Sequence, residues 1–159
     1  MITLKKVIIL TPNNRNFDII DEFVLDEKQT TGFFPLKPDF LACMSNIGDS
    51  SRLTILDSRG IIKFKMGDYP PFLNSDKTMG DNYIFQSSIS GCATLNKIVL
   101  ACKNTDVLEI YDLNNGLEKR FQGPIGIQVT ILDKQVGKWT MRLSEPGYLT
   151  YGDLNANDN

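Results

Sequence analysis

Two observations predict an all-β fold of antiparallel strands for this chain of 159 residues. Short runs that alternate apolar and polar residues recur between clusters of Gly, Pro, Asn and Asp, a pattern typical of half-buried antiparallel strands joined by turns. One stretch is also spelled twice, as FLACMSNIGDSSRLTILDSRGIIKFKMGDYP from Phe40 and as VLACKNTDVLEIYDLNNGLEKRFQGPI from Val99. Long runs with a helical period are absent, so strands account for the regular structure.

The expected strands follow one another along the chain with little between them except turns. They are Lys5–Thr11, Phe33–Leu36, Asp39–Ser45, Arg52–Asp57, Ile61–Met66, Asn82–Ile89, Lys97–Lys103, Val107–Asp112 and Leu117–Gln122. Asn16–Lys28 is the nearest candidate for a helix, but we favour two strand pieces there. Val129–Gly137 is expected to form a further hairpin.

The repeat predicts how these strands are grouped. Leu41-Ala42-Cys43 aligns with Leu100-Ala101-Cys102, and Leu53–Asp57 aligns with Leu108–Asp112. The units cover about residues 33–67 and 82–123, within a single β-rich domain or propeller fragment over 1–159. A small four-stranded sheet cannot bury both faces alone, whereas stacked copies bury each face on a neighbour. Arranged radially, such sheets are the blades of a β-propeller.

The predicted architecture is therefore two to three antiparallel blades, as part of a six-bladed propeller. A β-sandwich with two similar hairpins is the alternative. In each unit an Asp at a strand end can accept hydrogen bonds from the backbone two residues on, and a nearby Gly supplies a positive φ. This predicts hairpin turns at Ser58–Gly60 and Asn114–Gly116.

Composition and charge exclude several classes of function. The formal net charge of −2 gives no basic surplus for a phosphate backbone, so nucleic acid is not an expected partner. No apolar run approaches the ~20 residues of a membrane span, and no export signal is visible. The chain has no histidine, which excludes Ser-His and Cys-His nucleophile pairs and the usual zinc sites.

The three cysteines lack metal-binding spacing and are expected to be buried, free thiols. Cys43 and Cys102 should occupy equivalent inward positions on equivalent strands. We expect Cys92 to be a small buried side chain as well.

The residues of the two units resemble a bacterial TolB-like six-bladed β-propeller domain of unknown function. The matching positions lie between about residues 34 and 119: Arg52, Asp57, Gly60, Gly67, Asp68, Tyr69 and Pro70, then Glu109, Ile110, Tyr111, Asp112 and Gly116. The tail after residue 123 departs from the pattern, and a six-bladed ring needs more chain at ~40–50 residues per blade. The resemblance implies an exported, envelope-associated protein, and it supplies no catalytic residues.

Few motifs suggest a ligand site. Gly67–Pro71 could line a propeller mouth, but a rigid connection with Tyr69 packed between sheets is the simpler interpretation. Asp153–Asn159 resembles the opening of a calcium loop without its Gly and Glu, and we interpret it as a polar terminus. The neighbouring carboxylates Asp21-Glu22 and Asp26-Glu27 should point to opposite faces of a strand. Trp139 is expected to pack in a core.

These observations favour a non-enzymatic binding module for a protein or glycan at the bacterial cell envelope, with no catalytic residues, no metal ligands, no cofactor and unknown binding residues. The alternative is a propeller-type lactonase or hydrolase with an oxygen-liganded divalent metal. Because part of a ring leaves faces open, we expect either a longer protein or a homo-oligomer. The expected contact strands are near Lys5–Leu10 or Val129–Leu143.

Overall fold

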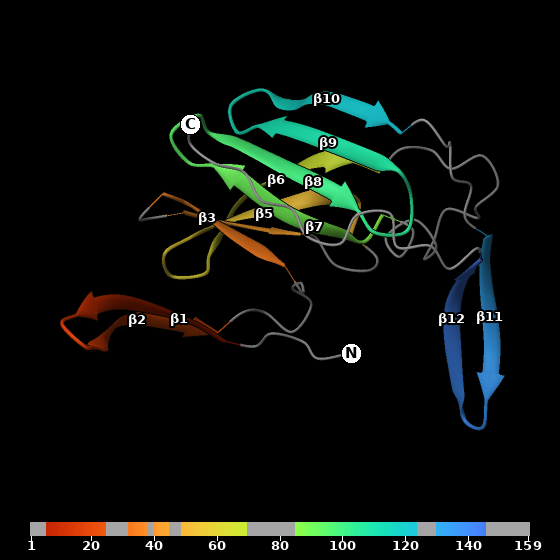
Figure 1. Ribbon diagram of the computed structural model, residues 1–159, viewed down its shortest axis with the longest axis horizontal. Coiled ribbons are helices and arrows are strands. Elements are labelled where there is room, and N and C mark those ends of the chain that lie inside the picture. The colour runs from red at the N-terminus through yellow and green to blue at the C-terminus, as the bar shows by residue number, and fades with distance from the viewer. Residues whose placement is uncertain are drawn as a thin grey trace.

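The computed structural model describes residues 6–24, 32–37, 40–44, 49–69, 85–123 and 130–145 (Figure 1). Within these ranges the regular structure consists of twelve β-strands and no helix. All strand pairs are antiparallel, and they form two two-stranded and two four-stranded sheets. The predicted all-β antiparallel class is confirmed.

The first sheet is a long hairpin of β1 (Lys6–Asn13) and β2 (Asn16–Val24). The described part of Asn16–Lys28, the nearest candidate for a helix, is thus one strand, and its last four residues lie outside the described residues. Its register shifts because Ile9 pairs with Asp21 and Leu10 with Ile19, which leaves Ile20 as an additional residue. A bulge of this kind bends a strand without ending it.

The second sheet is a four-stranded meander that we call sheet I. Its strands are β3 (Phe33–Lys37), β4 (Phe40–Met44), β5 (Ser51–Asp57) and β6 (Ile62–Asp68), paired in chain order. Between β5 and β6, a carboxylate oxygen of Asp57 accepts hydrogen bonds from the amides of Arg59 and Ile61, both at 3.0 Å. Gly60 has a φ of 79°. The predicted turn at Ser58–Gly60 is confirmed.

The third sheet, sheet II, repeats this plan. Its strands are β7 (Ser87–Cys92), β8 (Lys97–Cys102), β9 (Val107–Asp112) and β10 (Gly116–Gln122), again paired in chain order. Asp112 accepts bonds from the amides of Asn114 (2.8 Å) and Asn115 (3.1 Å), and Gly116 has a φ of 86°. The second predicted hairpin turn is confirmed, with Gly116 as the first residue of β10.

The first strand of sheet II begins later than predicted. Asn82–Ile89 was expected to be a strand, but the described part of it enters the sheet only at Ser87, and β7 continues to Cys92. The reason lies at Phe85, whose carbonyl accepts bonds from the Arg52 guanidinium and the Ser87 hydroxyl. The backbone carbonyl of Phe85 therefore accepts hydrogen bonds from side chains and not from a neighbouring strand.

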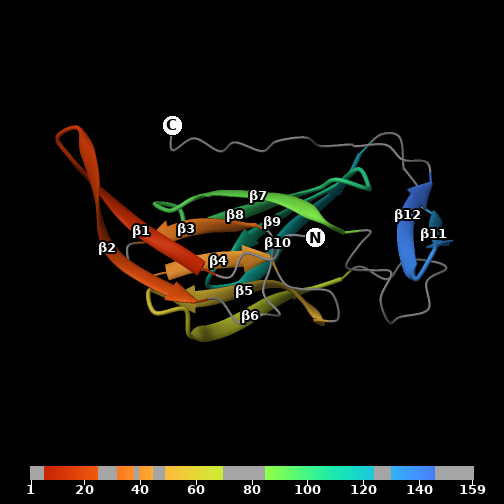
Figure 2. The same ribbon diagram turned by 90° about the horizontal axis from the view of Figure 1, so that it is seen from below.

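Sheets I and II stack face to face, with β3 beside β7 and β6 beside β10 (Figures 1 and 2). The main core lies between them. Its buried members come from both sheets: Leu36, Ala42, Leu53, Ile55, Ile98, Leu100 and Tyr111. The base of the β1–β2 hairpin packs on the other face of sheet I, where Phe23 contacts Leu41, Cys43 and Leu56. The order of layers is therefore hairpin, sheet I, sheet II.

The two sheets are stacked head to tail. In sheet I, Leu41, Cys43 and Leu56 face the preceding layer, the hairpin. The aligned residues of sheet II also face the preceding layer: Leu100 and Tyr111 belong to the core with sheet I, and Cys102 contacts Arg52 of sheet I. The two sheets thus have the same orientation in the stack. Each sheet turns the same set of aligned positions toward the layer that precedes it in the chain.

The three cysteines are buried and form no disulfide. Cys43 and Cys102 are both fully inaccessible, and each lies on the second strand of its sheet. The predicted equivalence of these two positions is confirmed, together with the absence of a disulfide.

A last hairpin, β11 (Thr130–Val136) with β12 (Trp139–Glu145), projects beyond the sheets (Figure 1). Val129–Gly137 was expected to form a hairpin by itself, but its described part is the single strand β11 and the turn residue Gly137, which has a φ of 62°. No helix long and apolar enough to cross a membrane occurs among the residues that the structure describes.

Candidate functional site

A buried ion pair joins sheet I to sheet II. Arg52, near the start of β5, donates from Nε to the Oε2 atom of Glu109 on β9 at 2.8 Å. The Arg52 side chain is 4% exposed and that of Glu109 is completely buried. A charge in such a place is tolerated only when it is paired and hydrogen-bonded.

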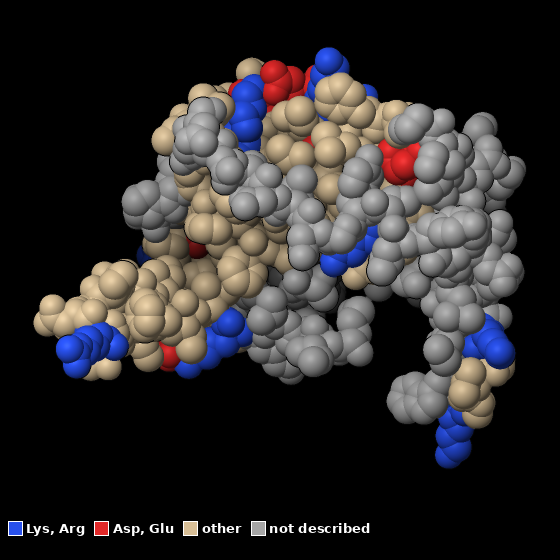
Figure 3. Space-filling model, viewed as in Figure 1, with Lys and Arg blue, Asp and Glu red and all other residues tan. Residues whose placement is uncertain are grey.

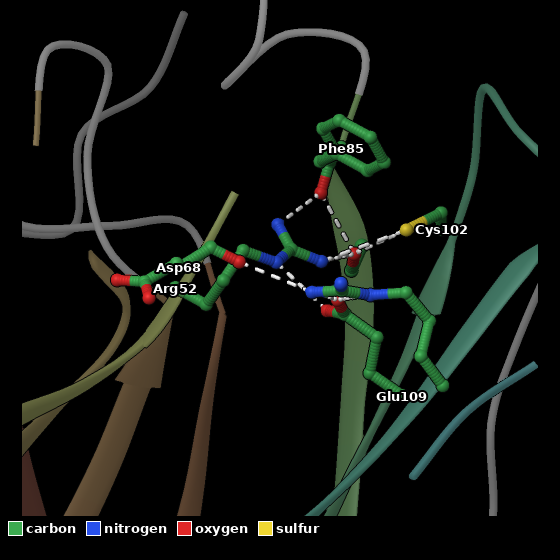
Figure 4. A network of polar contacts seen from close by, with 7 residues as sticks. Arg52, Asp68, Phe85, Cys102 and Glu109 are labelled. Atoms are coloured by element: carbon green, nitrogen blue, oxygen red, sulfur yellow. Dashed lines mark hydrogen bonds and ion pairs between the residues drawn. The ribbon is translucent and has the colours of Figure 1, made fainter. Parts of the chain in front are cut away.

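The remaining donors of Arg52 are also used within sheet II. Nη1 donates to the Phe85 carbonyl at 2.7 Å, and Nη2 lies 3.1 Å from the Ser87 hydroxyl and 3.5 Å from the Cys102 sulfur. Figure 4 shows the guanidinium between the Phe85 carbonyl and the Glu109 carboxylate. This single side chain therefore contacts three strands or strand ends of the neighbouring sheet.

Aromatic rings flank the same guanidinium. Its central carbon lies 5.1 Å from the ring centre of Tyr69 and 5.4 Å from that of Phe85, within the range of cation–π attraction. Burial alone would lower the pKa of Arg52, but the charge of Glu109 beside it prevails and the pKa is raised. Arg52 therefore remains a cation throughout the ordinary pH range.

A second arginine binds the other oxygen of Glu109. Arg120 on β10 donates to Oε1 at 2.7 Å, and it also reaches the Asp68 carbonyl on β6 at 3.1 Å. Its side chain is 30% exposed. Glu109 thus lies between two guanidinium groups, and Arg120 provides a second polar link between the sheets.

Tyr111 lies next to this cluster, at a close approach of sheet II to Gly67 of sheet I. A Cβ atom on Gly67 would lie 2.6 Å from the Tyr111 hydroxyl oxygen, so only a glycine allows the edge of sheet I to meet this ring. Burial raises the pKa of Tyr111, and the negative charge of Glu109 adds to the effect. Within the described part of the chain, no group gives this buried hydroxyl a hydrogen bond of ordinary geometry, and it stays protonated.

The hydrogen bonds of this cluster indicate a structural role. Both Glu109 oxygens accept from arginines, and the Arg52 donors point at protein acceptors. Burial raises the pKa of the Cys102 thiol, which keeps the sulfur protonated and unreactive. We therefore assign the cluster to holding sheets I and II together.

A second feature is the outward side of the β1–β2 hairpin, which we call the outer hairpin face. The register places Lys6, Ile8, Leu10 and Pro12 of β1 on the same side as Phe17, Ile19, Glu22 and Val24 of β2. The opposite side, with Val7, Ile9 and Phe23, packs on sheet I.

Large apolar side chains dominate the outer hairpin face and stay in solvent. Ile8 is 47% exposed, Leu10 49%, Phe17 67%, Ile19 62% and Val24 72%. In Figure 3 the hairpin, at the lower left, is covered largely by uncharged side chains. A contiguous apolar surface of this kind marks an interaction site more often than scattered exposed residues do.

The structure separates the sequence candidates. Within Gly67–Pro71, Tyr69 packs with Phe85, Cys102 and Val107, which agrees with a packing role for Tyr69. Pro70 and Pro71 lie outside the described residues. Asp21 and Glu22 are on opposite sides of the hairpin, as expected for strand neighbours. Asp26-Glu27 and Asp153–Asn159 also lie outside the described residues, and the side chain of Trp139 is not described.

Within the described ranges, no group of three or more His, Cys, Asp and Glu side chains is arranged to hold a metal ion. Comparisons with protein-family models, with curated proteins and with solved structures find no match to this chain.

Sequence reasoning missed the Arg52–Glu109 pair, although both residues were among those that carried the family resemblance. They are 57 positions apart, and no local pattern marks a charge that will be buried by a distant partner. A signal for the outer hairpin face was present: Val7 to Leu10 are apolar at consecutive positions, which makes both sides of the strand apolar.

Proposed function

We propose that this chain is a non-enzymatic module that binds a protein partner through the outer hairpin face. The observation that carries the proposal is the row of exposed Ile, Leu, Phe and Val side chains on the side of the hairpin that faces away from its contact with sheet I. Aliphatic side chains suit an apolar protein surface. A glycan would call for more aromatic and polar groups than Phe17, Lys6 and Glu22 offer.

The β-propeller architecture is part of this proposal. The head-to-tail stacking of sheets I and II supports it, because successive blades of a propeller use equivalent positions in one direction around a ring. A sandwich of two similar sheets does not require this relation. The setting at a bacterial cell envelope is proposed from the sequence resemblance.

A non-enzymatic role is supported by the burial of Arg52 and Glu109 and by the hydrogen bonds that their polar atoms make within the protein. Arg52 and Glu109 are the most buried charged groups among the described residues, and their polar atoms bind one another and the neighbouring strands. A catalytic carboxylate needs a path to its substrate, whereas Glu109 is fully enclosed.

The test compares three proteins for binding to immobilised proteins, among them the wild-type chain itself, and to a glycan array. They are the wild type, a variant with Leu10→Lys and Ile19→Lys on the outer hairpin face, and a control with Val136→Lys on the other hairpin. We expect protein binding by the wild type and the control, and its loss in the Leu10/Ile19 variant. Glycan binding that survives in the Leu10/Ile19 variant would overturn the proposal.

A further inference from the structure

We infer that the partner of the outer hairpin face is a second copy of this chain, packed on it about a two-fold axis. This inference rests on the proposed function, and it names the occupant of the same surface. Three properties of the face support it: its area, its charge and its place in the stack of layers.

The area fits a small dimer. The five apolar side chains that are 47–72% exposed offer on the order of 600 Å², close to the ~800 Å² that each partner buries in an interface of standard size. Two such faces in contact would bury roughly twice that area, at the lower end of the standard class. We therefore expect a dimer that dissociates in the micromolar range.

The charges of the face suit contact with an identical copy. Its two charged side chains are Lys6 and Glu22, and they already form an ion pair of 2.6 Å with each other. The acidic residues Asp18 and Asp21 lie on the opposite side of the hairpin. Two outer hairpin faces can consequently meet without like-charge repulsion, which would oppose self-association of a face with net charge.

The stack of layers explains why this face is open. Sheet I has layers on both of its faces: the hairpin on one and sheet II on the other. Among the described layers the hairpin is the end one, yet its outer side carries five large apolar side chains. A two-fold contact between hairpins would continue the stack once and then close, because both copies use the same surface.

A contact between the hairpin and a different surface of the next copy would behave otherwise. Such a heterologous contact leaves a free face on every added copy and leads to open-ended assembly unless a ring closes. The two-fold contact thus predicts a defined dimer with no larger species.

Sedimentation velocity between 1 and 100 µM tests the inference on the full chain. We expect a dimer for the wild type and for Val136→Lys. The pair of changes Leu10→Lys and Ile19→Lys should weaken association by more than about 100-fold, because four ammonium groups would be desolvated in the contact. Phe17→Lys is a second variant at the tip of the hairpin, and far-UV circular dichroism verifies the fold of each.

Mixing experiments separate the two-fold contact from a heterologous one. A variant with Glu at positions 10 and 19 should be monomeric alone and should form a heterodimer with the Lys variant, since each charged hairpin then meets its opposite. In a heterologous contact both hairpins would meet an unchanged surface, and mixing would restore nothing. Recovery in the mixture supports the inference, and its absence overturns it.

Failure of the inference is distinguishable from failure of the proposed function. A wild type that stays monomeric at 100 µM overturns the second-copy inference, as does a dimer that survives all three hairpin variants. If that monomer binds the apolar dye ANS and the Leu10/Ile19 variant does not, the face is an accessible apolar surface and the proposed function stands. Equal dye binding by both proteins overturns the proposed function too.

Discussion

The two junctions between layers differ in what fills them. Between sheets I and II, an extended apolar core is combined with Arg52, Glu109 and Arg120, which join strands across the gap. Between the hairpin and sheet I, a smaller apolar cluster around Phe23 provides the packing. The comparison teaches that the first junction is specific as well as stable, whereas the second depends on apolar burial, which is not directional.

The largest effect that would test this difference comes from Glu109→Gln. Removing the carboxylate charge leaves the buried Arg52 without its counter-ion, and breaking a buried pair in this way costs about 3–5 kcal/mol of the free energy of unfolding. Urea denaturation followed by circular dichroism measures it. Glu118→Gln is the matched control, because Glu118 pairs with Lys97 while 49% exposed and should cost no more than ~1 kcal/mol. Equal losses for the two variants would contradict the assigned role of the cluster.

Gly67→Ala tests the close approach of the sheets at the same junction. The new Cβ would collide with the Tyr111 ring and hydroxyl, in a backbone with φ of 76° that disfavours any L side chain. We expect a loss of roughly 2–4 kcal/mol, from overpacking and from the strained φ together.

Gly116→Ala is the control for that variant. Its φ of 86° is similar, but a Cβ there has nothing within 4 Å, so only the conformational cost of about 1–2 kcal/mol applies. The difference between the two variants in thermal unfolding isolates the contact with Tyr111. A Gly116 variant as unstable as the Gly67 variant would show that the contact contributes nothing.

Phe23→Ala probes the hairpin junction. Phe23 packs with Leu41, Cys43 and Leu56 and also lies against Gly60. Truncation should cost about 2–3 kcal/mol, below the 3–5 of a Phe in a central core, because this cluster is small. Hydrogen exchange should show faster opening of β1 and β2, with β5 and β9 unchanged. Uniform acceleration across all strands would mean that the two junctions open as one unit.

The smallest expected effect is the loss of stability in acid that comes from the carboxylates of the two hairpin turns, Asp57 and Asp112. Backbone amides, first that of Ile61, lower the pKa of Asp57. Lys97 and then the Asn114 amide lower the pKa of Asp112. Each carboxylate has a lower pKa in the folded than in the unfolded chain, so its stabilisation is present above about pH 4 and is lost as the pH falls through the folded pKa.

Thermal melts between pH 6 and pH 2.5 measure this loss. Asp57→Asn should lower the melting temperature at pH 6 and flatten its dependence on acid, because the variant has no carboxylate to protonate at the turn. Asn114→Ala changes no carboxylate and should keep the slope of the wild type. An unchanged slope in Asp57→Asn would exclude this turn as a source of the acid sensitivity.

Local signals in the sequence determined the strands and their turns. Alternation predicted β5, β6, β8 and β9 close to their observed bounds, because a strand exposes successive side chains to opposite sides. Asp57 and Asp112 marked the two hairpins, because an Asp side chain caps the backbone of its own turn. These interactions lie within a few residues of each other and need no distant partner.

Only the tertiary structure decided which faces meet and which charges are enclosed. Period-two alternation defines two sides of a strand but does not say which side meets which neighbour. The start of β7 also depended on a distant residue, since Arg52 takes the Phe85 carbonyl from the strand ladder. In the sequence Glu109 looks like an ordinary strand residue. Its burial and its pairing with Arg52 depend on the stacking of the two sheets, because the environment of a charge is set by what packs around it. The same stacking gave the hairpin an inner side on sheet I and left its other apolar side in solvent.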